Sequence, residues 1–495
     1  MDNKKLSLFA LVLMIFTSVF GSANISRAFY LMGYASIIWY ILAALCFFIP
    51  FAFMIAEFGA AFSKKHGGIY TWMSESVNPK FAFTGISMWY ASAIIWMVNT
   101  SSAIWVPLSN AIFGVDKTSD GHLFGLSSVE TIGILAVILM IIITFIATRG
   151  ISQIQKVTSI GGFAAMLTNV ILIVGGAIIL LINGHTFQPL SWKAILVSPN
   201  PQYDSLINVL GFVVYAIFAY GGLETIGGLV DQTKTPEKTF PRGITISALT
   251  ISVVYSIGIF MVGAFTNWSQ VLGSHHNINL VNVPFIILNN FGYQLGTALN
   301  FSHGVSVEIG MWVSRYVGIS IFLALSGAFI TLIISPIKTI VEGTPKEIWP
   351  KFFTKINKHD VPGNAMMIQG LLVIAFILII SFGGQSAKAF FNILVQMTNV
   401  AMVIPYLFIA FAFIGFKANS KIKKPFVFYK NPLIAKIAVC VVMLTVGFAI
   451  IFTIIAPALS GNYVSSIWMV VGPVIFGIIG YLLYHHYEKK YLKNN

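Results

Sequence analysis

The chain has 495 residues, of which 57% are hydrophobic and only 9% are charged, and its mean hydropathy is +0.87. These values exclude a soluble globular protein, because repeated apolar runs of about 20 residues are typical of helices that cross a bilayer. The net charge of +14 would suit a nucleic-acid-binding protein, but the basic residues gather in the loops between apolar runs. We therefore expect no nucleic-acid partner, and some attraction to anionic membrane lipid.

Twelve apolar runs follow one another along the chain, and each is long enough to form a membrane-spanning helix. They cover residues 6–30, 35–62, 82–114, 128–148, 157–183, 207–230, 243–265, 309–342, 363–381, 389–415, 434–456 and 465–485. The sequence thus predicts an all-α polytopic membrane protein with 12 transmembrane helices, forming a single transmembrane domain over residues 1–495.

The distribution of basic residues predicts the orientation. Placing the amino terminus in the cytoplasm puts most of the 29 Lys and Arg residues in cytoplasmic segments. The positive-inside rule then places both termini in the cytoplasm and the protein in the inner (cytoplasmic) membrane. The first run is too long, and its start too weakly basic, for a cleaved signal peptide.

The first and sixth runs are interrupted near their middles. The first contains Gly21-Ser22-Ala23-Asn24, and the sixth contains Gly221-Gly222, Glu224 and a second glycine pair. Glycine pairs weaken a helix at membrane depth, and a carboxyl group there is costly unless it has a role or a partner. Two glycine-broken spans at corresponding places in two halves indicate the midplane binding site of a transporter.

The two breaks also predict an internal repeat. Spans one to five (6–183) can be laid over spans six to ten (207–415), with the broken spans matched and spans eleven and twelve (434–485) left over. An odd number of spans per copy inverts the second copy, which is the five-plus-five inverted-repeat plan.

Three motifs resemble signatures of the amino acid–polyamine–organocation (APC) superfamily, and the resemblance covers nearly the whole chain. They are Phe20-Gly21-Ser22-Ala23-Asn24-Ile25, Ala56-Glu57-Phe58-Gly59 followed by Gly67-Gly68-Ile69-Tyr70, and Phe218-Ala219-Tyr220-Gly221-Gly222-Leu223-Glu224. Within the superfamily the chain resembles inner-membrane transporters that are grouped with the glutamate:GABA antiporter branch. The resemblance implies a LeuT-like fold with discontinuous helices 1 and 6.

The resemblance also implies that the two breaks bind the backbone of an amino-acid substrate. Unwound N–H groups suit a carboxylate, and freed carbonyls suit an ammonium group. The expected substrate-binding residues are Gly21, Ser22, Ala23, Asn24, Ile25, Phe218, Ala219, Tyr220, Gly221, Gly222, Trp96 and Asn99. The family's second glycine is Ala23 here, which adds a methyl group where the substrate would approach. The alternative is that the glycines only allow close helix contacts.

Charged residues inside the spans have two interpretations each. Glu224 would gate the site or exchange a proton, or else it would fix the geometry of the break through hydrogen bonds. Glu57 is expected to be structural, holding the loop through Tyr70 with nearby lysines as partners. Arg27 and Arg315 would steer an anionic substrate, or would extend to the outer surface, where Glu308 is a candidate partner.

The leading hypothesis is a secondary carrier for amino acids or related amines that works by alternating access, by exchange, with glutamate/GABA exchange as one option. The alternatives are a proton-coupled amino-acid symporter and a membrane sensor that binds amino acids without transport. The chain lacks the motifs of a membrane hydrolase or a nucleotide-driven pump, so we expect no enzyme. Its nine histidines and two cysteines show no metal-ligand spacing, so we expect neither metal nor cofactor, and the sequence does not indicate an oligomeric state.

Overall fold

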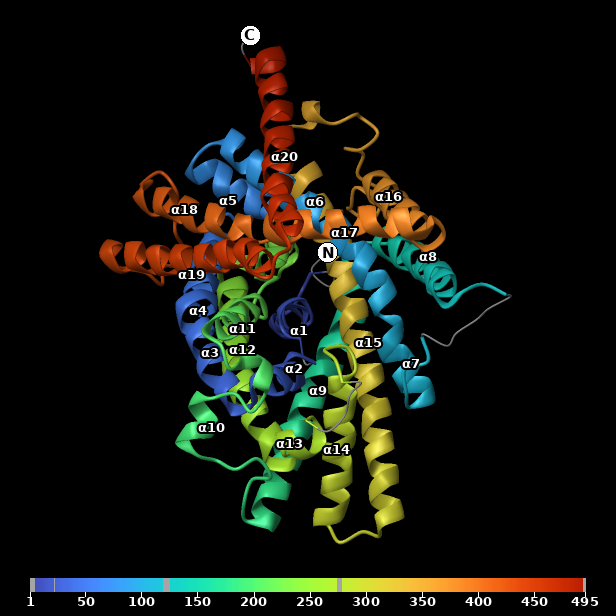
Figure 1. Ribbon diagram of the computed structural model, residues 1–495. Coiled ribbons are helices and arrows are strands. Elements are labelled where there is room, and N and C mark those ends of the chain that lie inside the picture. Colours follow the sequence, from blue (N-terminus) through green and yellow to red (C-terminus); the bar gives the residue numbers. More distant parts are fainter. Residues whose placement is uncertain (1–4, 22, 119–124, 274–277, 493–495) are drawn as a thin grey trace.

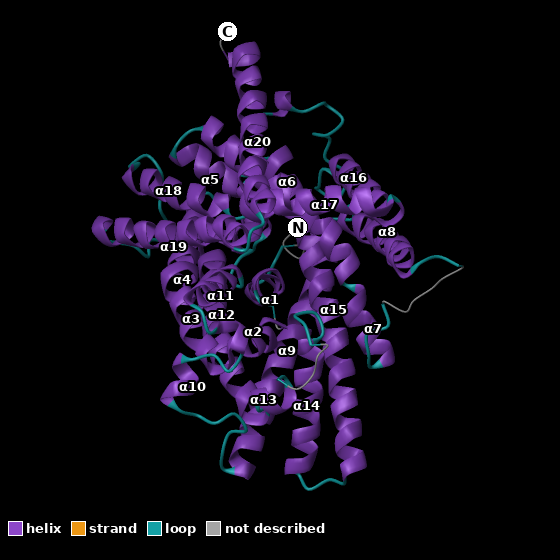
Figure 2. Cartoon of the chain, in the orientation of Figure 1, coloured by secondary structure: helices purple, strands orange, loops and turns teal. Residues whose placement is uncertain are grey.

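The computed structural model describes residues 5–21, 23–118, 125–273 and 278–492, and within these ranges it is almost entirely helical (Figures 1 and 2). The α-helices are α1 (Leu8–Val19), α2 (Ala23–Met32), α3 (Ser36–Ala43), α4 (Ile49–Ala61), α5 (Gly68–Ser76), α6 (Pro79–Ala103), α7 (Trp105–Phe113), α8 (Ser128–Ala147), α9 (Ile151–Asn183), α10 (Trp192–Leu196), α11 (Leu206–Phe218), α12 (Pro236–Phe265), α13 (Trp268–Val271), α14 (Val283–Ala298), α15 (His303–Val341), α16 (Gly363–Phe382), α17 (Gly384–Ala401), α18 (Ile404–Ala418), α19 (Pro432–Leu459) and α20 (Tyr463–Tyr487). Shorter 3-10 or π segments are η2 (Gly33–Ala35), η3 (Ala44–Phe48), η4 (Pro201–Tyr203), η5 (Leu223–Gln232), η6 (Lys346–Ile348) and η7 (Glu488–Leu492). The prediction of an all-α membrane protein is confirmed.

The number of long apolar helical stretches among the described residues is lower than the predicted number of spans. The described residues contain 11 helical stretches long and apolar enough to cross a membrane, so the count of twelve is not confirmed. The difference arises at the start of the chain, where the predicted runs 6–30 and 35–62 fall within one stretch of 54 residues, Leu8–Ala61. Only the one-turn segment η2 separates α2 from α3, and Gly33 adopts the positive φ of 56° at this junction.

Both predicted breaks are present. Helix α1 ends at Val19, because Phe20 has an extended backbone, and α2 begins only at Ala23. Helix α11 ends at Phe218, and the chain continues as η5 from Leu223, after Gly222 with a φ of 110°. The first and sixth membrane helices are therefore discontinuous, as the LeuT-like fold requires.

The two breaks lie against each other in the interior. Helix α1 occupies the centre of the molecule and packs against α9, α12 and α15 (Figure 1). A Cβ atom added to Gly222 would collide with the carbonyl oxygen of Ser18, in the last turn of α1. Only glycine combines this close approach with a positive φ, so the position of Gly222 brings the second break next to the first.

The two broken spans are also joined at the end that carries the amino terminus. Leu6, just before α1, forms an isolated parallel bridge with Thr233, just after η5. The Leu6 N–H donates to the Gln232 carbonyl (2.8 Å), and the Lys234 N–H donates to the Leu6 carbonyl (2.9 Å). This pairing links the two broken spans on that side.

Glu57 in α4 is structural, but its expected partners were wrong. The buried carboxylate binds Lys417 of α18 at 2.9 Å and accepts hydrogen bonds from the backbone N–H groups of Phe428 and Tyr429, at 2.9 and 2.7 Å. Lys65, expected nearby, pairs instead with Glu75. The true partners come from the end of α18 and from the loop between α18 and α19, which the fold brings over α4.

A charged cluster lies where η5, α15 and the loop before α5 meet. Asp231 Oδ2 is 2.9 Å from His66 Nδ1 and 3.5 Å from the Nζ of the buried Lys338, which is itself 3.7 Å from Glu342. The hydrogen bond to Asp231 raises the pKa of His66 above its ordinary value of 6.5. These contacts hold the end of the second broken span to α15.

The raised pKa of His66 predicts a pH-dependent stability. A histidine whose pKa is higher in the folded state adds stability below the unfolded-state pKa of about 6.5, and this contribution disappears as pH rises through the folded-state pKa. The Tm of the wild type should therefore exceed that of His66→Gln at about pH 6, and the difference should shrink at about pH 8.5. Thermal unfolding in detergent at both values checks this. The control is His185→Gln, because the exposed His185 ring contacts the nearby Asn183 carbonyl and the Phe187 ring and forms no ion pair among the described residues. A difference that grows with pH would contradict the assignment.

Candidate substrate-binding site

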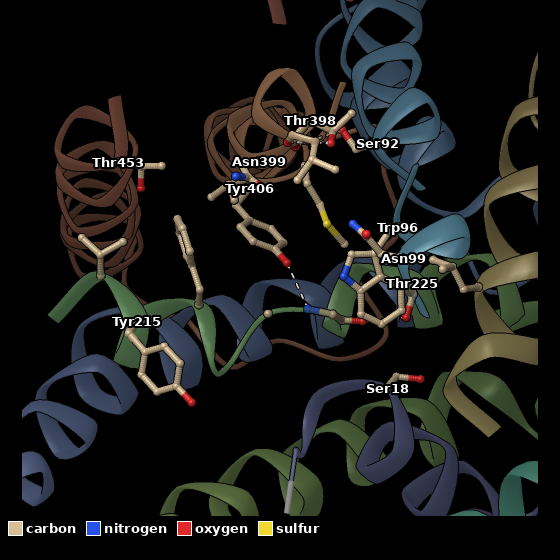
Figure 3. A pocket seen from close by; sticks show the side chains of 18 of the residues that line it. Ser18, Ser92, Trp96, Asn99, Tyr215, Thr225, Thr398, Asn399, Tyr406 and Thr453 are labelled. Atoms are coloured by element: carbon tan, nitrogen blue, oxygen red, sulfur yellow. Dashed lines mark hydrogen bonds between the residues drawn. The ribbon is translucent and has the colours of Figure 1, made fainter. Parts of the chain in front are cut away.

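A cavity of about 560 Å³ lies beside the break between α11 and η5 (Figure 3). Its wall combines α1, α6, α11, η5, α15, α17, α18 and α19, so it draws on helices from the whole length of the chain. It is lined by Ser18, Ser92, Trp96, Asn99, Gly211, Val214, Tyr215, Phe218, Gly221, Gly222, Thr225, Ala328, Leu332, Val395, Thr398, Asn399, Met402, Val403, Tyr406 and Thr453. A cavity of this size accommodates an amino acid together with water.

Some polar groups of the wall already have hydrogen-bond partners, and others do not. The hydroxyls of Thr225, Thr398 and Thr453 donate to carbonyl oxygens of their own segments, at 2.6, 3.0 and 2.7 Å. The carboxamides of Asn99 and Asn399 differ, because both residues are exposed and neither side chain bonds another group in the described part of the chain. These two carboxamides are available to a ligand.

The second break lines the cavity with Gly221 and Gly222, and hydrogen bonds to Tyr406 and Glu224 hold this segment in place. The Gly222 N–H donates to the hydroxyl oxygen of Tyr406 (3.0 Å) and to Glu224 Oε2 (3.2 Å) (Figure 3). Glu224 is fully buried, with the Tyr406 and Trp89 side chains as polar neighbours. Its second oxygen, Oε1, has no hydrogen-bond partner among the described residues. The carboxyl group therefore lies directly behind the cavity wall and keeps an unused hydrogen-bonding position.

The predicted binding residues of the second break divide between the cavity and the packed interior. Phe218, Gly221 and Gly222 line the cavity. The Ala219 carbonyl accepts a hydrogen bond from the Tyr255 hydroxyl (3.2 Å), and the buried Tyr220 hydroxyl donates to the Tyr40 carbonyl (3.2 Å). The side chain of Tyr220 thus packs in an aromatic cluster, outside the cavity lining.

Two further predicted residues, Trp96 and Asn99 of α6, line the cavity. They lie one helical turn apart, so they present neighbouring side chains on the same face of the helix. Trp96 is 37% exposed, which is unusual for a tryptophan inside a membrane span and consistent with an indole that forms a cavity wall.

The predicted residues of the first break contact other helices. The Gly21 N–H donates to the Tyr255 hydroxyl (3.0 Å), so Tyr255 of α12 bridges the two breaks. Ala23 borders a void of only about 10 Å³ between α9, α14 and α15, and Ile25 is fully buried against α12. Ser22 lies outside the described residues. From the first broken span, Ser18 is the residue that lines the cavity.

Asn24 and the two membrane arginines are not part of the cavity lining, although Asn24 bonds the lining residue Tyr215. Asn24 Oδ1 accepts hydrogen bonds from the Tyr215 hydroxyl (3.1 Å) and from Arg27 Nη1 (3.3 Å). Arg27 Nε also donates to the Leu280 carbonyl (2.6 Å). Arg315, for which Glu308 was the candidate partner, instead donates to the Ile112 carbonyl at 3.1 Å.

Sequence reasoning missed the cavity residues contributed by the last helices. Tyr406 follows Pro405 at the start of α18, where the chain is interrupted after α17, and Thr453 lies in α19 outside the predicted repeats. Gly211, one turn before Tyr215 in α11, was also missed. For Tyr406 the sequence did offer a signal, because its hydroxyl-bearing side chain directly follows Pro405 inside an apolar run.

Comparison with known proteins places the chain in a family. The family profile described as "Amino acid permease" matches residues 6–479. The inner membrane transporter YjeM of Escherichia coli is 49% identical, covering 99% of this chain and 98% of its own length. More distant relatives are the aspartate/glutamate permease AcaP of Lactococcus lactis subsp. cremoris, 23% identical over 88% of this chain and 85% of its own length, and a glutamate/gamma-aminobutyrate antiporter of Lactococcus lactis subsp. lactis, 22% identical over 84% and 76%. The chain therefore belongs to the amino acid permease family and is a membrane transporter, not an enzyme.

Proposed function

We propose that this chain is a secondary active transporter that exchanges amino acids or related amines across the cytoplasmic membrane by alternating access. The observation that carries the proposal is the cavity at the break after α11, whose wall includes the unwound residues Gly221 and Gly222 together with Ser18 at the end of α1. Irregular backbone at membrane depth persists where it lines a cavity, and the dipoles of an unwound segment and of the adjoining helix ends suit the charged ends of an amino acid.

The proposal extends to the binding residues and the topology. Residues of both breaks, 21–25 and 218–222, contact the backbone of the substrate during the cycle. Trp96 and Asn99 contact the side chain of the substrate. The repeats are residues 6–183 and 207–415, followed by 434–485, and both termini lie in the cytoplasm, as the distribution of basic residues indicates. The pairing of Leu6 with Thr233 then lies on the cytoplasmic side, where it links the two broken spans.

Counterflow in proteoliposomes tests the exchange mode. Vesicles are preloaded with unlabelled amino acid or left empty, and uptake of the same labelled amino acid is followed. An exchanger should fill preloaded vesicles at least about tenfold faster than empty ones, because its empty carrier returns slowly. Equal uptake into empty vesicles under an imposed pH gradient would favour the proton symporter instead. Binding without any flux would identify a sensor.

One observation favours the proton-coupled alternative, namely the fully buried Glu224 with its unpartnered Oε1. An uncompensated buried charge is unfavourable, so the carboxyl group is suited to take up and release a proton as the cavity changes its access. Glu224→Gln keeps the shape and removes the proton. We expect this variant to lose the pH dependence of uptake between about pH 5 and about pH 8 while inserting normally. Uptake by Glu75→Gln, which alters an exposed carboxylate of α5, is the control. A Glu224→Gln profile that follows the wild type would remove the role proposed for this carboxyl group.

A further inference from the structure

The charge of the cavity wall bears on the substrate class. Among the described residues that line the cavity there is no Asp, Glu, Lys, Arg or His. Of the neighbouring cations, Lys338 pairs with Asp231 and Glu342, and Arg27 lies behind the wall residue Tyr215, where it bonds Asn24 and the Leu280 carbonyl. A substrate side chain would therefore find no charged partner in the wall.

This wall disfavours a charged substrate side chain of either sign. A carboxylate that leaves water for a partly apolar cavity needs a cation or several strong donors, and an ammonium or guanidinium group needs a carboxylate. The nearest acid behind the wall is Glu224, which would repel a second carboxylate when ionised and could not compensate it when protonated. The charges of the amino-acid backbone are different, because the unwound segments and helix ends supply dipoles for them.

The same wall does offer hydrogen bonds to an uncharged group. Asn99 of α6 and Asn399 of α17 both lie in the cavity wall, and their carboxamides have no partner among the described residues (Figure 3). A carboxamide donates and accepts hydrogen bonds, so two of them match a neutral polar group that does both. Trp96 and Val214 supply apolar surface beside them.

We propose that the substrate is an amino acid with an uncharged polar side chain, of the carboxamide or hydroxyl class, read by Asn99 and Asn399. This inference rests on the proposed transport function and specifies its substrate. The proposed substrate class differs from the compounds in the names of the distant relatives, which are glutamate, aspartate and gamma-aminobutyrate. These relatives are 22–23% identical to this chain.

The test compares substrates that differ only in charge. Glutamine and glutamate are nearly isosteric, as are asparagine and aspartate, so their comparison isolates the side-chain charge. Purified protein in proteoliposomes preloaded with glutamine should take up labelled glutamine at least about tenfold faster than labelled glutamate, and excess unlabelled glutamate or arginine should compete poorly. Glutamate uptake as fast as glutamine uptake would overturn the inference while leaving the exchanger intact.

A charge added to the wall should change the preference. Asn399→Lys places a cation in the cavity, and the ratio of glutamate to glutamine uptake should rise at least about tenfold. The matched control is Asn392→Lys, which adds the same charge to α17 at an exposed residue that is not part of the cavity lining. An equal change in both variants would show that general surface charge, and not the cavity, determines the preference, and would overturn the inference.

Ligand binding separates this inference from the transport function. Thermal unfolding of the detergent-solubilised protein is measured with glutamine or with glutamate, because a ligand that binds the folded state raises the Tm. Stabilisation by glutamine alone, without flux, would support the substrate class and contradict the transport function. Equal stabilisation by glutamate, or stabilisation by neither, would overturn the substrate class.

Discussion

Substitution of Gly222 by alanine should reduce transport by more than about 100-fold, because a displacement of about 1 Å at a binding site has effects of this size. Gly222 adopts a φ of 110°, which alanine rarely tolerates, and an added Cβ would collide with the Ser18 carbonyl oxygen. The same residue donates its N–H to Tyr406 and to Glu224. The variant would therefore separate the two breaks, move the cavity wall and disturb the support of the buried carboxyl group.

Uptake into proteoliposomes, normalised to the amount of folded protein, measures this effect. Gly447→Ala is the matched control, since Gly447 lies in the membrane helix α19 and an added Cβ there meets no atom within 4 Å. The control should transport like the wild type. Normal transport by Gly222→Ala would show that the contact between the breaks is not required for the cycle.

Removal of the Glu57 carboxylate should lower the free energy of unfolding by about 3–5 kcal/mol, because it leaves a partly buried cation without its partner. Glu57 is fully buried and holds Lys417 at 2.9 Å together with two backbone N–H groups of the loop between α18 and α19. In Glu57→Ala all three donors lose their acceptor. The loop should detach from α4, and the Tm in detergent should fall.

The control for this loss is a carboxylate in an exposed ion pair. Glu75 binds Lys65 at 2.6 Å, but the two side chains are 42% and 51% exposed. Glu75→Gln should cost no more than about 1 kcal/mol, because solvent screens such pairs. Similar Tm values for the two variants would contradict the anchoring role of Glu57.

The parts of this molecule that sequence reasoning predicted correctly depend on local composition. The breaks were predictable because Gly21 and the pair Gly221-Gly222 interrupt apolar runs, and these are the places where α1 and α11 end. Local signals of this kind persist because the membrane leaves helix and break as the main backbone alternatives. The family resemblance was a second source, since it implied that the third span faces the site, and Trp96 and Asn99 of that span line the cavity.

The parts that could not be predicted depend on contacts between distant segments. Glu57 and Lys417 are 360 positions apart, and nothing near either residue indicates the other. Tyr406 and Thr453 reach the cavity because the last helices pack around it. Likewise, the Tyr220 side chain packs against the aromatic rings of Tyr40, Phe48 and Tyr255, and its place in the motif does not indicate these contacts.

The central claim, that the cavity beside the breaks is the transport site, is tested most directly by substrate protection of a cavity cysteine. Thr453→Cys changes a cavity residue to which no substrate contact is assigned. It is made in a background without the native Cys46 and Cys440, and modification by a maleimide is timed with and without the transported amino acid. The account predicts that modification blocks uptake and that the amino acid slows it, while Asn392→Cys reacts at an unchanged rate. If Thr453→Cys still transports the amino acid but is modified at the same rate with and without it, the site lies elsewhere.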